Sequence, residues 1–179
     1  MKKVPIFAEH IWSIQYNGHD KCVFDELFDD DVWFSIEYLK EKYERNEDWI
    51  KSGPWAGLEE TQWIIEARNE AENFYDRFLD IDESGSNDWD SMFYPLSKNE
   101  YYLEYERKKS YSREYNDNLS IQPPSFFRLY AIKIDDNKYI ITGGTIKYAK
   151  NMNTHPDMKE QLNHINEVRK WIINNKITF

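Results

Sequence analysis

The chain has 179 residues, of which 40% are hydrophobic and 31% charged. That length favours a single domain over residues 1–179. No apolar run approaches the roughly 20 residues needed to cross a bilayer, and Glu9 and His10 interrupt the apolar stretch after the amino-terminal lysines, so we expect a cytoplasmic protein without a membrane segment or signal peptide.

The net charge of −10 is unevenly distributed. Residues 1–98 hold 10 basic and 23 acidic side chains, a balance of −13, whereas residues 99–179 hold 13 basic and 10 acidic side chains, a balance of +3. The first half would repel a phosphate backbone, and the second half would tolerate one. This distribution argues against a general nucleic-acid-binding protein and confines any such contact to the carboxy-terminal half.

Apolar spacing predicts a strand and two helices in the acidic half. Residues 5–16 alternate between apolar and polar positions, as in a half-buried strand. Three aspartates at 29–31 precede apolar residues at helical spacing, which predicts a first helix to about Trp49. A second helix is predicted from Trp63 to near Leu79, followed by a loop over residues 82–87.

The carboxy-terminal half is predicted to contain three strands and a helix. Tyr101, Leu103 and Tyr105 alternate with glutamates in a strand that continues into the basic residues 107–109. A polar connection over 110–124 leads to strands at 126–134 and 138–148, which form a hairpin.

A closing helix begins with a cap near Thr154 and continues to Ile172. The sequence therefore predicts an α+β fold, with an antiparallel meander of about four strands, two N-terminal helices and a C-terminal helix.

This order of elements, together with the sequence of the hairpin, resembles the RelE/HigB superfamily of toxin ribonucleases, in particular its HigB and phage-encoded branch. The segment Phe127-Arg128-Leu129-Tyr130 resembles the third strand of that family. The segment that ends in Gly143-Gly144-Thr145-Ile146-Lys147 resembles the last strand, with its apolar-His-Gly-apolar-apolar-Lys-Lys signature. The resemblance is clearest over residues 100–170. It implies metal-independent cleavage of messenger RNA, often at the ribosome, and an antitoxin partner.

The resemblance also implies a set of site residues. Arg128 matches the strand arginine and is expected to bind phosphate, because a planar guanidinium contacts two oxygens at once. Lys147 matches the first lysine of the signature. Lys150, Tyr148 and His155 lie close by in the sequence and are further candidates for charge stabilisation and proton transfer.

Two departures from the family pattern fit a relative that does not cleave RNA: Gly143 stands where the branch has His, and Tyr148 replaces the second lysine. Arg128 is also compatible with a solvated strand arginine, and Lys147 and Lys150 with protection of a sheet edge. The alternative function is a non-catalytic interaction module on the same scaffold. Its acidic half would bind a basic partner, or its aromatic residues would bind a second copy of the chain.

A metal site is the remaining candidate. Residues 80–88 begin as D-x-D-x-S-G, like an EF-hand calcium loop with Gly85 at its sharp turn. Position twelve is Ser91 in place of the bidentate Glu, so we expect a solvated acidic loop. Cys22 is the only cysteine, which excludes an internal disulfide and a cysteine-based zinc site. We expect no metal or other cofactor.

Overall fold

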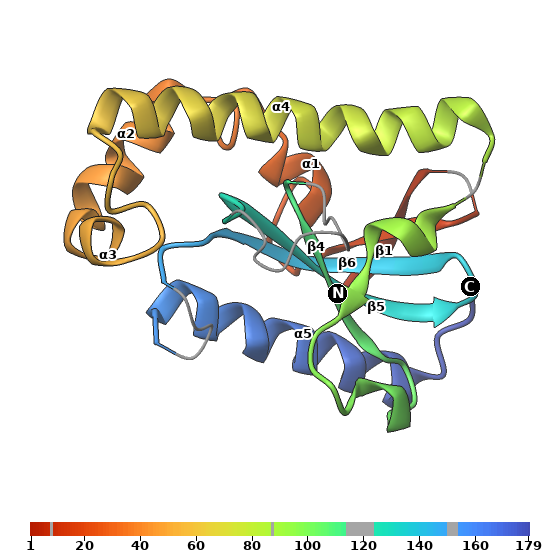
Figure 1. Ribbon diagram of the computed structural model, residues 1–179. Coiled ribbons are helices and arrows are strands. Elements are labelled where there is room, and N and C mark those ends of the chain that lie inside the picture. Colours follow the sequence, from red (N-terminus) through yellow and green to blue (C-terminus); the bar gives the residue numbers. More distant parts are fainter. Residues whose placement is uncertain (8, 87, 114–123, 150–153) are drawn as a thin grey trace.

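The computed structural model describes residues 1–7, 9–86, 88–113, 124–149 and 154–179. Within these ranges a mixed sheet lies between helices on both of its faces (Figure 1). Its six strands have the spatial order β1-β2-β6-β5-β4-β3. The strands are β1 Lys2–Phe7, β2 Ile11–Gln15, β3 Tyr94–Pro95, β4 Arg107–Tyr111, β5 Phe127–Asp135 and β6 Lys138–Ile146. The helices are α1 Val23–Leu27, α2 Ile36–Arg45, α3 Glu47–Ser52, α4 Glu60–Ser84 and α5 Pro156–Asn175, with 3-10 turns η1 Trp89–Met92 and η2 Glu100–Tyr102.

The two faces of the sheet have separate hydrophobic cores. Phe127 and Leu129 of β5 face the α4 side and pack in a cluster with Phe74 of that helix. Tyr130 and Ile132, farther along the same strand, face α5. Because strand side chains alternate between faces, β5 is buried on both sides and lacks the alternation of apolar and polar residues that a half-exposed strand shows.

The predicted fold class is wrong in its central feature. The structure is α+β, but its sheet is mixed: β2 pairs with β6 in parallel, and the other pairs are antiparallel. The strand predicted over residues 5–16 is a hairpin of β1 and β2, which turns at residues 9 and 10. No Gly or Pro marks this turn, so the period-two pattern runs through it. The described residues also form five helices where three were predicted.

The strand predicted at Tyr101 to Tyr105 is also wrong. Residues 100–102 form a 3-10 turn, and β4 begins only at Arg107. The cause is Glu100, whose buried carboxylate accepts hydrogen bonds from the Arg107 backbone N–H at 3.2 Å and from its Nη2 at 2.8 Å. These bonds fold the segment back on itself, and Tyr105 takes a left-handed conformation with φ of 57°.

Other predicted elements are confirmed. The hairpin of β5 and β6 is present, with Asn137 in the left-handed conformation at its turn. The second predicted helix corresponds to α4, which continues to Ser84 and ends at the left-handed Gly85. The loop predicted over residues 82–87 therefore begins only after Ser84. Asp80, Asp82 and Ser84 lie on a helix, where the EF-hand pattern needs a loop.

The remaining helices differ in their limits. The first predicted helix is divided into α2 and α3, and α1 was not predicted. Helix α5 begins as expected, but its cap is the His155 side chain, which accepts a hydrogen bond from the Asp157 backbone N–H, and not Thr154. No helix in the described part of the chain is long and apolar enough to cross a membrane.

Candidate functional site

Strand register brings Arg128 together with two lysines. Arg128 of β5 lies opposite Tyr111 of β4 and Thr145 of β6. Two residues further along β5, Tyr130 lies opposite Lys109 of β4. Residues directly opposite each other in a sheet share a face, so these side chains lie on the face that α5 covers farther along. Lys147 follows Thr145 by two residues, and its backbone N–H donates to the Phe126 carbonyl at 2.7 Å. We call Lys109, Arg128 and Lys147 the cation cluster.

Arg128 is buried at the centre of this cluster. Its side chain is 8% exposed, and its Nε has no hydrogen-bond partner among the described residues. The guanidinium carbon lies 5.1 Å from the ring centroid of Tyr111, and the Lys109 Nζ lies 5.7 Å from the same centroid. The hydroxyl of Tyr130 is also buried and lies beside the Arg128 guanidinium, and burial raises its pKa to about 12. An arginine in this position is not an ordinary solvated strand residue.

The two lysines of the cluster titrate abnormally. Burial, together with the smaller effect of the positive charges of Arg128 and Lys109, lowers the pKa of Lys147 to about 8. Burial and Arg128 also lower the pKa of Lys109, while the more distant Glu100 opposes this shift. The Lys109 Nζ donates to the Leu96 carbonyl at 3.3 Å. Among the described residues no carboxylate forms an ion pair with any of the three cations.

Sequence reasoning missed Lys109. It lies in the basic run 107–109, but which of these side chains faces Arg128 depends on where the strand begins and how it is paired. Lys108, one position earlier, lies on the other face and forms an ion pair with Glu106 at 2.6 Å. Strand register is therefore the only signal that separates the two lysines.

Tyr148 and His155 do not join the cation cluster. The Tyr148 side chain is 1% exposed, its ring centroid lies 4.6 Å from that of His155, and burial raises its pKa. His155 caps α5 and lies 2.9 Å from the side-chain oxygen of Asn46 through its Nε2. Both residues therefore connect α2 and α3 to the start of α5. Lys150 lies outside the described residues.

The glycine at position 143 has a packing reason. A Cβ added to Gly143 would lie 2.0 Å from the side-chain oxygen of Gln161 in α5. A histidine there, as in the family signature, would require Gln161 to move. Gln161 thus occupies the space above Gly143.

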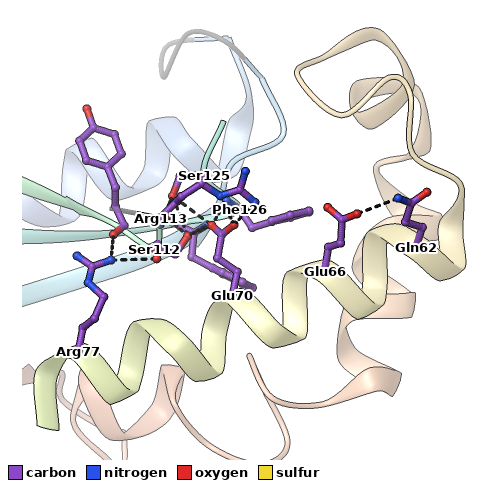
Figure 2. A network of polar contacts seen from close by, with 10 residues as sticks. Gln62, Glu66, Glu70, Arg77, Ser112, Arg113, Ser125 and Phe126 are labelled. Atoms are coloured by element: carbon purple, nitrogen blue, oxygen red, sulfur yellow. Dashed lines mark hydrogen bonds and ion pairs between the residues drawn. The ribbon is translucent and has the colours of Figure 1, made fainter. Parts of the chain in front are cut away.

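A buried carboxylate fixes the strand ends that carry the cluster. Glu70 of α4 is 7% exposed, and its Oε1 accepts a hydrogen bond from the Phe126 backbone N–H at 2.7 Å and from the hydroxyls of Ser112 and Ser125 (Figure 2). Its Oε2 accepts from the Arg113 guanidinium at 2.8 and 3.1 Å. One side chain therefore connects α4 to the residues immediately after Tyr111 and before Arg128.

An acidic groove runs along α4, on the side of the sheet that faces this helix. Its volume is about 770 Å³ and it contains Glu66, Asp76 and Asp80, which form no ion pair with a described residue. Arg77 also lines the groove, and its guanidinium donates to the backbone carbonyls of Tyr111 and Ser112 at 3.1 and 3.0 Å. Figure 2 shows Arg77 and Glu70 reaching from the helix to the sheet. The groove and the cation cluster thus present opposite charges.

Comparisons with protein-family models, with curated proteins and with solved structures find no match for this chain.

We predict that Glu70→Gln destabilises the fold by about 3 kcal/mol, because the amide removes the charge that balances Arg113 and places an N–H group among hydrogen-bond donors. Urea denaturation measures the change. Glu66→Gln, on the same helix, is the matched control and should change the stability by less than about 0.5 kcal/mol. Equal effects of the two substitutions would show that the Glu70 network does not support the strands.

We predict that Lys147→Met does not destabilise the protein at pH 7 and instead stabilises it. The folded state binds the Lys147 proton less tightly than the unfolded state, since its pKa is about 8 against about 10.4 unfolded. The resulting loss in the free energy of unfolding is complete below about pH 8 and disappears as the pH rises toward about 10.4. Denaturation at pH 7 and pH 10 should therefore show a stability advantage of the variant that shrinks with pH. A loss of stability at pH 7 would indicate a structural lysine.

Proposed function

We propose that the chain is a RelE/HigB-type endoribonuclease that works without a metal, with the cation cluster binding the phosphate at the scissile bond. The observation that carries the proposal is the concentration of Lys109, Arg128 and Lys147 at one place with no ion-paired carboxylate among the described residues. Desolvated like charges destabilise a fold, and such a cost is typical of a functional site.

The chemistry assigns a role to two of these groups. In RNA cleavage the 2′-hydroxyl loses its proton to water and attacks phosphorus, a 2′,3′-cyclic phosphate forms as the bond to the 5′-oxygen breaks, and negative charge develops on the phosphate oxygens. The Arg128 guanidinium would stabilise that charge, because it offers several N–H donors in a fixed plane. The Lys147 ammonium, with a pKa of about 8, is able to donate a proton to the departing 5′-oxygen near neutral pH.

The proposal gives no catalytic role to Tyr148 or His155, because the structure describes both in contacts away from Arg128. It includes the expected biological setting: cytoplasmic messenger RNA as substrate, often at the ribosome, and an antitoxin that holds the protein inactive. Lys109 is added to the site as a third phosphate-binding cation.

A growth assay combined with RNA cleavage by the purified protein in a metal chelator tests the proposal. The wild-type chain should arrest growth and cleave RNA, and Arg128→Ala should lower the cleavage rate by roughly 100-fold or more, because a buried charge at the reacting phosphate is lost. Arg68→Ala removes an exposed arginine that pairs with Glu72 and should have no effect. Absence of cleavage by the wild type, or equal cleavage by Arg128→Ala, would overturn the proposal.

The cleavage rate should fall as the pH rises through about 8, since both phosphate binding and proton donation need the protonated form of Lys147. An arginine at position 147 stays charged to beyond pH 12. In Lys147→Arg, phosphate binding should therefore no longer contribute an inflection near pH 8. The measurement is a pH profile from 6 to 9.5 for both proteins. An identical inflection in the variant would assign the titration to another group.

A second candidate function is supported by the acidic groove. Glu66, Asp76 and Asp80 are available to bind a basic segment of a partner protein, as the interaction-module alternative requires. Under this alternative neither the wild-type chain nor Arg128→Ala affects growth, and a basic peptide binds wild type more tightly than a variant with Asp76→Asn and Asp80→Asn. Equal affinity for both proteins would exclude the groove.

A further inference from the structure

The cation cluster carries more positive charge than one phosphodiester would neutralise. A phosphodiester has a single negative charge, so its binding would leave two of the three cations unbalanced. A phosphomonoester, with a second pKa of about 6, carries close to two negative charges at pH 7. The charge of the cluster is therefore matched more closely by a dianionic phosphate group, in addition to the diester that the proposed function places there.

The hydrogen-bonding capacity of the site favours the same class of group. The Arg128 Nε is buried and has no hydrogen-bond partner in the described part of the chain, and the buried Tyr130 hydroxyl lies beside the Arg128 guanidinium. A phosphomonoester presents three terminal oxygens, which provide acceptors for both of these donors and for a lysine ammonium. A diester presents only two charged oxygens, and a second ester group would have to be accommodated beside them.

Among the described residues, the neighbouring groups do not supply the missing negative charge. Glu100 is the one carboxylate with an electrostatic effect on Lys109 among the described residues, and it is bound at 2.8 Å by the Arg107 guanidinium. The described groups in contact with Arg128 and Lys109 also include the Tyr111 ring, the Leu96 carbonyl and the Tyr130 hydroxyl. None of these groups carries a charge at neutral pH.

From these observations we infer that Lys109, Arg128 and Lys147 form a binding site for a dianionic phosphate group, with the buried Tyr130 hydroxyl as an additional donor. The group is a phosphomonoester, carried either by the end of an RNA or by a free nucleotide. This inference rests on the same site as the proposed function and adds a ligand class to it. Lys109 is the third positive charge of the site, and each of the three cations interacts about twice as strongly with a dianion as with a monoanion at the same distance.

Methyl phosphate and dimethyl phosphate are matched probes, since they differ by one methyl group and one negative charge. NMR-monitored titration of the wild-type protein at pH 7.5 should show at least about tenfold tighter binding of methyl phosphate. Between pH 7.5 and pH 5 this advantage should disappear as methyl phosphate becomes a monoanion, whereas sulfate, a dianion at both pH values, should keep its affinity. Equal binding of the two phosphates at pH 7.5 would overturn the inference.

Lys109→Met tests the role of the third cation. It should weaken the binding of methyl phosphate by at least about threefold more than the binding of dimethyl phosphate, because the dianion interacts more strongly with each cation. Lys40→Met, which removes an exposed lysine on α2, is the control and should preserve the full preference. An unchanged preference in Lys109→Met would overturn the assignment to this residue.

Two further probes separate the sources of the phosphate. A short RNA with a terminal phosphate that binds at least about tenfold tighter than the same RNA without it supports the RNA end, and a mononucleotide that binds as tightly supports a free nucleotide. RNA cleavage is measured separately. Dianion preference without cleavage would overturn only the proposed function, and cleavage without dianion preference would overturn only this inference.

Discussion

The pairing of β5 with β4 and β6 determines which side chains meet on the α5 face of the sheet. It places Arg128 between Tyr111 and Thr145 and brings Lys109 and Lys147 to the same face of the sheet. Because β5 is covered on both faces, the guanidinium is held in a position with little access to water. Three positive charges are thereby concentrated where solvent screens them poorly.

The fold supports this arrangement from the opposite face of the sheet. Glu70 reaches from α4 to backbone and side-chain donors at the ends of β4 and β5, so a helix from the acidic half determines where the cationic strands end. The acidic and basic halves of the sequence are thus parts of one arrangement. The carboxylates of α4 lie along a groove beside the strand ends, and the cations lie on the α5 face.

Local sequence patterns predicted the elements whose signals are local. The long apolar periodicity of α4, the two apolar runs of the β5–β6 hairpin and the start of α5 are all readable from the chain. The parallel pairing of β2 with β6 was not, since it joins residues far apart in sequence, and the turn between β1 and β2 was not, because no Gly or Pro marks it. The same holds for the site. Arg128 and Lys147 were identified, whereas Lys109 depends on strand register and the Glu70 contacts join residues 42 to 56 positions apart. Tyr148 and His155 are next to the site in sequence but are directed into the core by strand alternation and by helix capping.

Lys147 shares a desolvated site with Arg128, and no carboxylate among the described residues forms an ion pair with either side chain. An NMR titration of the Lys147 side chain in the wild-type protein and in Arg128→Met tests this arrangement. We predict a pKa of about 8 in the wild type and a clear rise toward 10.4 when the guanidinium is removed. A wild-type pKa near 10.4, or one that Arg128→Met leaves unchanged, would contradict it.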